Sequence, residues 1–242
     1  ESGDAVIVLR GTADNATLTL ENTTLVGNPQ IINNAQGAKV VYGATEATLD
    51  FSGADFGAVT LGELKDVTIV GDEDSKVRFV TTADSKLENV TIKNVPFEFS
   101  GSSKNDACIY INAEAQIDNL VIEDCAISGN GSKSSWGIFG QNPDATITVK
   151  DCTFSNMGYP IQTQTPGGYK SMTIDNCTFS DLKSWAIMIQ YNNYEGDLFV
   201  TNCNFVNCAN GLMRIGNFTE GHTFQFTNNT IVNSAEHPAK KW

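Results

Sequence analysis

The feature that most constrains the fold of this chain is a short phrase that returns at a nearly constant interval. The phrase is an apolar pair separated by one residue, then an Asn or Asp two positions later, then Cys or Asn, any residue and an apolar residue. Its clearest copies are Ile147-Thr-Val149-Lys-Asp151-Cys152-Thr-Phe154, Met172-Thr-Ile174-Asp-Asn176-Cys177-Thr-Phe179, Leu198-Phe-Val200-Thr-Asn202-Cys203-Asn-Phe205 and Phe224-Gln-Phe226-Thr-Asn228-Asn229-Thr-Ile231. The Asx positions are 25, 26 and 26 residues apart. Such a period indicates one small unit stacked many times.

The Asx residue of each phrase is predicted to turn a corner. Apolar residues alternate with period 2 on both sides of it, but the phase shifts across it, so one residue is used for a bend. Asn and Asp tolerate the left-handed conformation that such a bend requires, and Gly adopts it freely. The predicted corner residues are Asn22, Asn94, Asp124, Asp151, Asn176, Asn202 and Asn228, with Gly71 in the same place of an earlier unit.

A third strand is predicted after each phrase, for example at Trp136–Gly140, Tyr159–Thr163 and Trp185–Ile189. Three short strands and three turns in about 25 residues make one coil of a parallel β-helix, and coils stack about 4.8 Å apart. The sequence therefore predicts an all-β solenoid of about nine coils, with residues 1–242 forming a single domain of a longer exported protein. A leucine-rich repeat has a similar period, but it needs an apolar residue three positions before the first strand. Those positions hold Asp144, Tyr169, Glu195 and Gly221.

Four of the six cysteines fall in the same slot of successive units. Cys125, Cys152, Cys177 and Cys203 alternate with apolar residues, so we expect a column of buried thiols. Parallel side-chain directions in such a column are poor geometry for disulfides. Single cysteines separated by a full coil do not converge on a metal ion. Cys108 and Cys208 stand outside the column, and the pattern assigns them no role.

Charge and composition narrow the possible partners. The chain has 15 basic and 28 acidic residues, a net charge of −13, which disfavours nucleic acid and anionic membrane surfaces as partners. A run of 18 apolar residues, as a membrane span requires, does not occur. N-glycosylation motifs begin at the corner residues Asn22, Asn176 and Asn228, where a glycan would obstruct stacking. This position favours a bacterial exported protein over one made in a glycosylating pathway.

The ladder phrases, such as Thr173-Ile-Asp-Asn-Cys-Thr-Phe179 and Phe226-Thr-Asn-Asn-Thr-Ile231, resemble those of right-handed parallel β-helix proteins of the pectate-lyase-like superfamily. The resemblance covers roughly residues 5–235. Within this superfamily, the chain is more specifically similar to the exported β-helix domains of gut Bacteroidetes. Resemblance to that group implies a cell-surface or extracellular location, lipid anchoring within a longer protein, neighbouring domains in the same chain, and contact with a polysaccharide or surface glycan. The coil itself does not specify an activity, because one fold hosts many functions.

The residues that could carry catalysis lie beside the third strands. Glu195 and Asp197 belong to one loop and Glu220 and His222 to the next, so one coil apart they could approach each other, with Arg214 on the strand between. A glycosidase needs two facing carboxyl groups, and a polysaccharide lyase of this fold needs carboxylates for calcium plus a base. The outward positions of the third strand (Tyr110, Phe139, Gln162, Met188 and Arg214) hold almost no carboxylates, so calcium is expected only if the chain is a lyase.

Binding residues are better represented than catalytic ones. The next outward row reads Asn112, Gln141, Gln164, Gln190 and Gly216, and its amides suit sugar hydroxyls or pair with one another as a structural ladder. Nearby Tyr169, Tyr191, Tyr194 and Phe218 offer rings for sugar faces. Trp136, Tyr159 and Trp185 share the parity of inward residues, which favours core packing. The leading hypothesis is a non-catalytic, adhesin-like carbohydrate-binding module that needs no cofactor. A polysaccharide lyase or glycosidase, and a structural spacer, are the alternatives.

Overall fold

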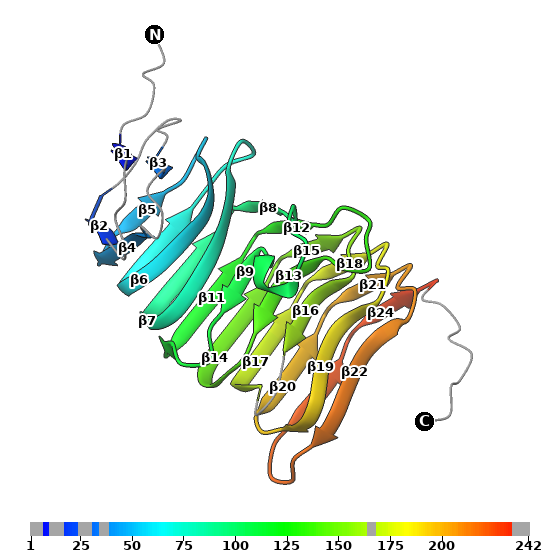
Figure 1. The fold of residues 1–242 in the computed structure, drawn as a ribbon. Helices are drawn as coiled ribbons and strands as arrows, with labels where there is room; N and C mark the ends of the chain where they lie inside the picture. Colours follow the sequence, from blue (N-terminus) through cyan, green and yellow to red (C-terminus); the bar gives the residue numbers. More distant parts are fainter. Residues whose placement is uncertain (1–6, 10–16, 24–30, 34–38, 164–167, 234–242) are drawn as a thin grey trace.

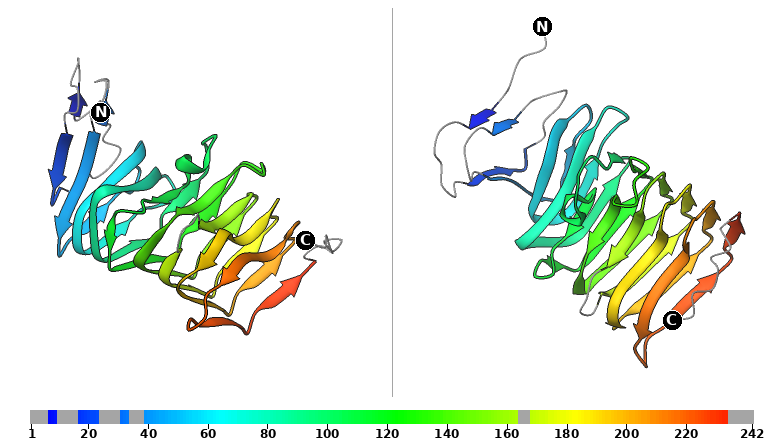
Figure 2. Two further views of the ribbon diagram at one scale, coloured as in Figure 1. Left: turned by 60° about the horizontal axis from the view of Figure 1, so that its bottom comes forward. Right: turned by 45° about the vertical axis from the view of Figure 1, so that its right-hand side comes forward.

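The computed structural model describes residues 7–9, 17–23, 31–33, 39–163 and 168–233. It is a parallel β-solenoid of about seven turns, in which successive coils stack along one axis (Figures 1 and 2). The all-β solenoid is thus confirmed, with fewer coils than the nine predicted. The coils differ in length, and a 25-residue unit therefore overcounts them: Thr68 of one coil pairs with Thr91, whereas Val90 pairs with Leu120. None of the described helices is long and apolar enough to cross a membrane.

Three faces run along the solenoid, and each is a stack of parallel strands. Face I holds the start of β6 (Asp55–Val70) and β7 (Lys76–Lys93), then β9 (Ile109–Ile111), β13 (Trp136–Gly140), β16 (Tyr159–Thr163), β19 (Trp185–Tyr194) and β22 (Gly211–Phe218). Face II holds the ends of β6 and β7, then β10 (Gln116–Ile117), β11 (Asn119–Glu123), β14 (Asn142–Lys150), β17 (Tyr169–Asp175), β20 (Asp197–Thr201) and β23 (Phe224–Thr227). Face III holds β8 (Pro96–Glu98), β12 (Ala126–Ser128), β15 (Thr153–Ser155), β18 (Thr178–Ser180), β21 (Asn204–Val206) and β24 (Thr230–Val232).

The remaining elements lie outside this regular pattern. At the N-terminal end, β1 (Ile7–Leu9) pairs with β3 (Ile31–Asn33), and β2 (Thr17–Glu21) with β4 (Lys39–Thr45). Both β4 and β5 (Thr48–Asp50) then pair with β6. A 3-10 turn, η1 (Lys104–Asp106), lies in an insertion between β8 and β9.

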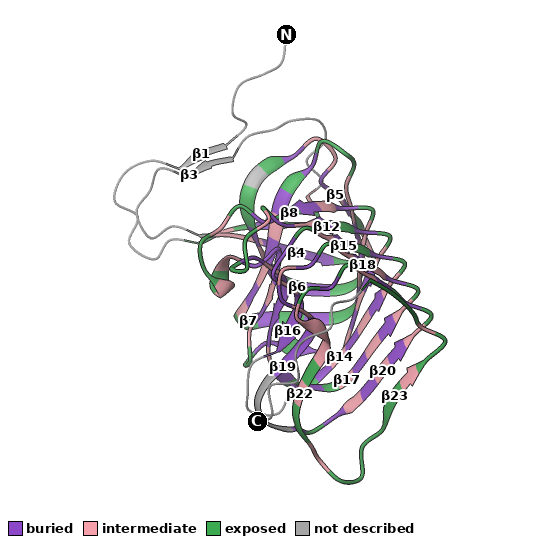
Figure 3. Ribbon diagram, turned by 90° about the vertical axis from the view of Figure 1, so that its right-hand side faces the viewer, coloured by how far each residue is buried: buried purple, intermediate pink, exposed green. Residues whose placement is uncertain are grey.

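The core is built of inward columns, one residue per coil. Phe154, Phe179 and Phe205 stack with ring centroids 4.9 Å apart and planes within 4° and 6° of parallel. On face II, the column Val90, Leu120, Ile147, Met172 and Leu198 is fully buried. Buried residues accordingly line the inside of the coils up to β21, whereas the last coil, β22 to β24, is only partly covered (Figure 3). Because the apolar residues alternate with period 2 and repeat with each coil, one continuous core extends through the stack.

The corner prediction is confirmed at all seven Asx residues. Asn22, Asn94, Asp124, Asp151, Asn176, Asn202 and Asn228 have φ between 46° and 58°. Their side chains also link coils: Asn176 Nδ2 donates to Asp151 Oδ1 at 2.6 Å. The prediction for Gly71 is wrong, since its φ is not positive; a Cβ there would lie 2.8 Å from Ser75 Oγ. A second left-handed column, five residues after the first, was not foreseen; it consists of Asn156, Asp181, Asn207 and Asn233.

The thiol column is confirmed as well. None of the six cysteines, each among the described residues, forms a disulfide, and all six are buried. Cys152 Sγ donates to the Lys150 carbonyl oxygen at 3.2 Å, and the other three column thiols make the equivalent contact. Side-chain hydrogen bonding to Cys152, together with burial, raises the pKa of Cys125 and Cys177. All four column thiols are buried in the apolar core and therefore act as packing groups.

The prediction of three strands in every coil is wrong between residues 39 and 93. There the chain passes from face II to face I by short turns, one of which is closed by the Asp72 backbone N–H donating to Ser75 Oγ at 2.9 Å. Face III begins only at β8. A hollow of about 450 Å³ lies where the neighbouring strand of face III would run.

Candidate functional site

The outward row of face I has the register that the sequence predicts. Tyr110 pairs with Phe139, Phe139 with Gln162, Gln162 with Met188, and Met188 with Arg214. The row is not the open surface that outward parity implies, however. Phe139, Gln162 and Met188 are only 3%, 5% and 4% exposed.

Part of the cover is the insertion that contains η1. Lys104 Nζ lies 5.4 Å from the centre of the Phe139 ring, which is a cation–π contact. Arg78 Nη1 holds the insertion from below by donating to the carbonyl oxygens of Asn105 at 3.1 Å and Ala107 at 3.3 Å. Asp106 accepts the backbone N–H of Ser102 and of Ser103, and these hydrogen bonds hold the pKa of its carboxyl below the usual range.

Beside this cover, face I carries a groove of about 470 Å³. It is lined by Lys104, Tyr110, Asn112, Glu114, Phe139 and Gln141. Tyr110 is half-buried, and its ring centroid lies 6.0 Å from that of Phe139. Gln141 Oε1 is buried and accepts no hydrogen bond from any described residue. A buried acceptor without a donor is costly, so this oxygen is suited to a ligand hydroxyl or N–H.

Among the members of the predicted amide row that the structure describes, Gln141 is the one whose surroundings suit a ligand. Asn112 lines the same groove, but its Oδ1 already accepts the Glu114 backbone N–H at 2.8 Å. Gln164 lies outside the described residues, as do the side chains of Gln190 and Tyr191. The prediction for those three residues therefore stays a prediction.

The column Trp136, Tyr159 and Trp185 is not in the core, as its parity suggested, but half-buried at the edge of face I. Gly137 faces inward instead, because a Cβ there would lie 3.2 Å from Ile127 and 3.4 Å from Phe154. The Trp136 ring stacks on Tyr159 at 5.8 Å, and its Nε1 donates to Gln162 Oε1 at 2.6 Å. Since the ring faces lie against one another, the column presents ring edges to solvent.

Two predicted sugar-stacking residues are buried, so that prediction is wrong. Tyr169 is 1% and Tyr194 0% exposed, and burial raises the pKa of both phenols. Tyr194 Oη donates to the Asp197 carbonyl oxygen at 3.2 Å, and its ring stacks on half-buried Phe218 at 5.7 Å. Register shifts in β14 and β19 turn these residues inward at the corner between faces I and II.

The proposed catalytic residues come together only in part. Asp197 Oδ1 accepts the Thr223 backbone N–H at 2.7 Å and lies 3.9 Å from His222 Nδ1. Glu195 and Glu220 are exposed. Arg214 is exposed too, on the outward row of face I. Asp197 thus bridges the turns of two adjacent coils, which is a structural role for a loop carboxylate.

Metal ligation has no candidate in the part of the chain that the structure describes. No group of three or more His, Cys, Asp and Glu side chains lies close enough there to hold an ion. The calcium site expected for a lyase would need several oxygen ligands from neighbouring coils. Several of the described carboxylates instead pair with lysines of neighbouring coils, for example Glu123 with Lys93 at 2.9 Å and Lys150 at 3.0 Å.

Comparison with known proteins bears on the fold alone. The model of one protein family, described as the right handed beta helix region, matches residues 63–239. Neither the curated proteins nor the solved structures contain a significant match.

Proposed function

We propose that this chain, which belongs to the right-handed β-helix family, binds glycans in the groove on face I without cleaving them. Membership of the family does not assign this function, because the same coil serves unrelated activities. The proposed location is the outside of a bacterial cell, where the solenoid would display this groove as a surface module. Polysaccharide is the proposed partner class.

The buried, unpartnered Gln141 Oε1 is the observation that supports this proposal most directly. Sugars carry many hydroxyl donors, and one that reaches this oxygen would replace a missing hydrogen bond in a partly dry site. Tyr110 adds a half-exposed ring and a phenol, which is the amphipathic combination that suits a sugar face with a polar rim. Lys104 and Glu114 supply one charge of each sign at the groove.

A binding role without catalysis is favoured by the state of the carboxylates. Asp197 is occupied by Thr223 and His222, and Glu195 and Glu220 are exposed side chains on separate turns. Glycosidases hold their two carboxyl groups about 5 to 10 Å apart across one cleft. The face I groove contains one carboxylate, Glu114.

A glycan panel tests this proposal when binding and product release are measured on the same samples. We expect binding of at least one polysaccharide without new reducing ends or unsaturated products. Gln141→Leu should weaken binding at least tenfold, because the ligand donor would lose its acceptor. It should leave the free energy of unfolding unchanged or higher, since an unsatisfied buried oxygen is removed. Gln116→Leu is the matched control, because Gln116 is exposed on β10 at a different corner.

Three results would contradict the proposal in different ways. Product release would establish the lyase or glycosidase alternative, with Asp197→Asn and Glu220→Gln as the variants to test. Equal binding by the Gln141 and Gln116 variants would move the site away from the groove. Neither binding nor product release with any glycan would favour the third hypothesis, in which the chain is a structural spacer.

A further inference from the structure

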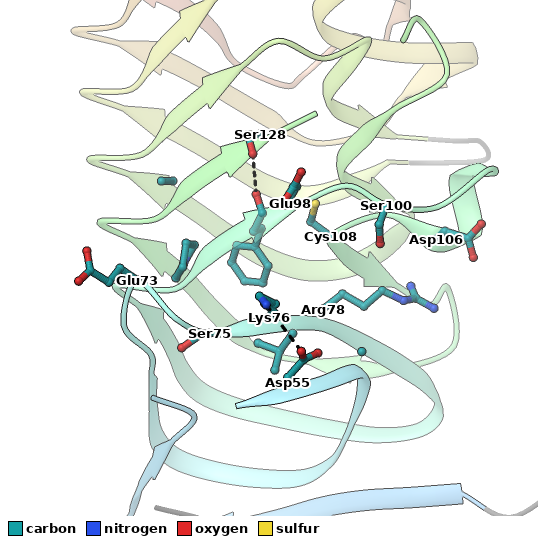
Figure 4. Close-up of a pocket in the computed structure, with 15 residues that line it drawn as sticks. Asp55, Glu73, Ser75, Lys76, Arg78, Glu98, Ser100, Asp106, Cys108 and Ser128 are labelled. Atoms are coloured by element: carbon teal, nitrogen blue, oxygen red, sulfur yellow. Dashed lines mark hydrogen bonds and ion pairs between the residues drawn. The ribbon is translucent and has the colours of Figure 1, made fainter. Parts of the chain in front are cut away.

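We propose that the hollow beneath β8 accepts an extended peptide segment of basic character, which completes face III as an added strand. This site is separate from the face I groove and independent of the glycan proposal. It lies where face III begins, between β8 and the Asp72–Ser75 turn of the coil below (Figure 4).

The hollow has the position of one missing strand. Along the rest of face III, each strand from β12 to β21 has a neighbour on both sides, and β8 pairs with β12 alone among the described strands. The coil below β8 replaces its face III strand by a tight turn, in which the Ser75 backbone N–H donates to the Asp72 carbonyl oxygen at 3.1 Å. The hollow of about 450 Å³ has Pro96, Phe97 and Glu98 of β8 on one wall and Glu73, Ser75 and Lys76 on the other, and it extends past β8 to Ala126 and Ser128 of β12.

The free edge of β8 presents backbone groups that can receive a strand. Phe99 N–H donates to the Ser128 carbonyl oxygen at 2.9 Å, so alternate residues of this segment point toward β12. The carbonyl of Pro96, and both the N–H and carbonyl of Glu98, must then point into the hollow. In a parallel ladder one partner residue bonds to both neighbours of the residue opposite it. The N–H of a single residue of the added strand can therefore donate to the Pro96 carbonyl oxygen, and its carbonyl oxygen can accept from the Glu98 N–H.

Pro96 restricts the edge to a short partner. It has no N–H, so β8 offers one donor and two acceptors, which is typical of an edge strand that resists open-ended pairing. The pairing mode is β-strand addition, in which backbone hydrogen bonds give affinity and side-chain pockets give specificity.

The side chains around the hollow define the partner's chemistry. Glu73 and Glu98 are exposed and make no hydrogen bond or ion pair with any described residue. The cations of the hollow are already engaged: Lys76 Nζ lies 3.8 Å from Asp55 Oδ2, and Arg78 holds the η1 insertion. A Lys or Arg on the outward side of the added strand would meet Glu98.

The inward side of the added strand must be small. A partner residue level with Phe97 would point into the core, as Phe97 itself does. That position is limited by Phe79, whose ring centroid lies 5.7 Å from that of Phe97. We therefore infer a segment of the form basic–small–basic.

The probe is the blocked peptide acetyl-Thr-Lys-Ala-Lys-Thr-amide, with backbone amide exchange and chemical shifts of the whole chain measured by NMR. In the free protein the Glu98 amide should exchange fast, whereas those of Phe97 and Phe99 should be protected by β12. Millimolar peptide should slow exchange at Glu98 in a saturable way. The same peptide with N-methylalanine should bind about tenfold more weakly, because it cannot donate to Pro96. A peptide with Glu in place of both Lys residues should not bind.

Four outcomes would overturn the proposal. A Glu98 amide already protected in the free protein would mean that the edge is closed. No saturable slowing at millimolar peptide would mean that no strand is accepted. Equal binding of the N-methylated peptide would reduce the effect to charge attraction. Shift changes confined to other acidic surfaces would place the contact elsewhere. All four measurements use the unaltered protein, alone or with a peptide, so none of them depends on whether a protein variant folds.

Discussion

The coils between residues 39 and 93 and those after residue 109 share one axis and one core but turn their corners differently. In the later coils a left-handed Asx residue separates short strands, and aromatic rings stack nearly parallel, as Phe154 and Phe179 do. In the earlier coils β6 and β7 run through a corner as strands of 16 and 18 residues, and Phe51, Phe79 and Phe97 meet edge to face. The regular coils repeat a unit, whereas the earlier ones leave a strand out, and the hollow beneath β8 lies at the junction.

The largest expected effect comes from removing one ring of each region. Phe179→Ala and Phe79→Ala should each cost about 3–5 kcal/mol of unfolding free energy, since both side chains are fully buried. Because each coil contacts only its neighbours, amide exchange should accelerate around the altered coil and less elsewhere. Denaturant unfolding with residue-resolved exchange measures both quantities. If amide exchange accelerated uniformly along the chain in either variant, the nearest-neighbour description would be wrong, and the two regions would unfold as one cooperative unit.

A smaller effect is expected from the corner column that separates face II from face III in the regular coils. Asn176→Ala should cost about 2 kcal/mol, because alanine is disfavoured at a φ of 50° and the hydrogen bond to Asp151 is lost. Asn176→Gly should cost about 1 kcal/mol, since glycine accepts that conformation and only the hydrogen bond is removed. Equal losses in chemical denaturation would show that backbone strain does not set the residue type at these corners.

The smallest expected effect concerns the charges that join the two regions on face II. Hydrogen bonds from Lys93 of β7 and Lys150 of β14 hold the pKa of Glu123 below its usual range. A carboxyl group with a lowered folded-state pKa stabilises the fold above its unfolded pKa of about 4.3 and loses that contribution as the pH falls through the folded value.

Wild type should therefore lose more unfolding free energy than Glu123→Gln between about pH 6 and about pH 3. Urea titrations at the two pH values measure the difference. The gap should narrow in about 1 M salt, because these side chains are partly exposed. An identical acid loss in both proteins would mean that the bridge does not join the regions energetically.

The sequence predicts the first corner column and the buried thiols because both are periodic. Asp151, Asn176 and Asn202 occupy the same slot, and stacking requires that equal slots have equal environments. The missing face III strands could not be predicted in this way, since the segment that contains Gly71 and Ser75 breaks the repeat. A turn there needs no left-handed residue, and the apolar pattern continues on both sides.

The exposure of face I could not be read from strand parity alone. Phe139 and Gln162 are outward in the pleat yet buried, because cover comes from Lys104 in the insertion that contains η1 and from Trp136 at the strand edge. Tyr169 and Tyr194 were misplaced because bulges shift their parity at the corner. Gln141 was correctly placed on the outward row, and its unpartnered oxygen follows only from the three-dimensional packing.

The equivalence of the Asx corners also makes the length of the rod an adjustable quantity. Residues 176–201 form one complete turn of the chain, so joining Asp175 directly to Asn202 restores the same phrase and places Phe154 next to Phe205. Such an excision would shorten the solenoid by about 4.8 Å while each remaining strand keeps a neighbour of the same kind. Duplication would lengthen it by the same step. The number of units thus sets the distance between the two ends of the solenoid, one coil at a time.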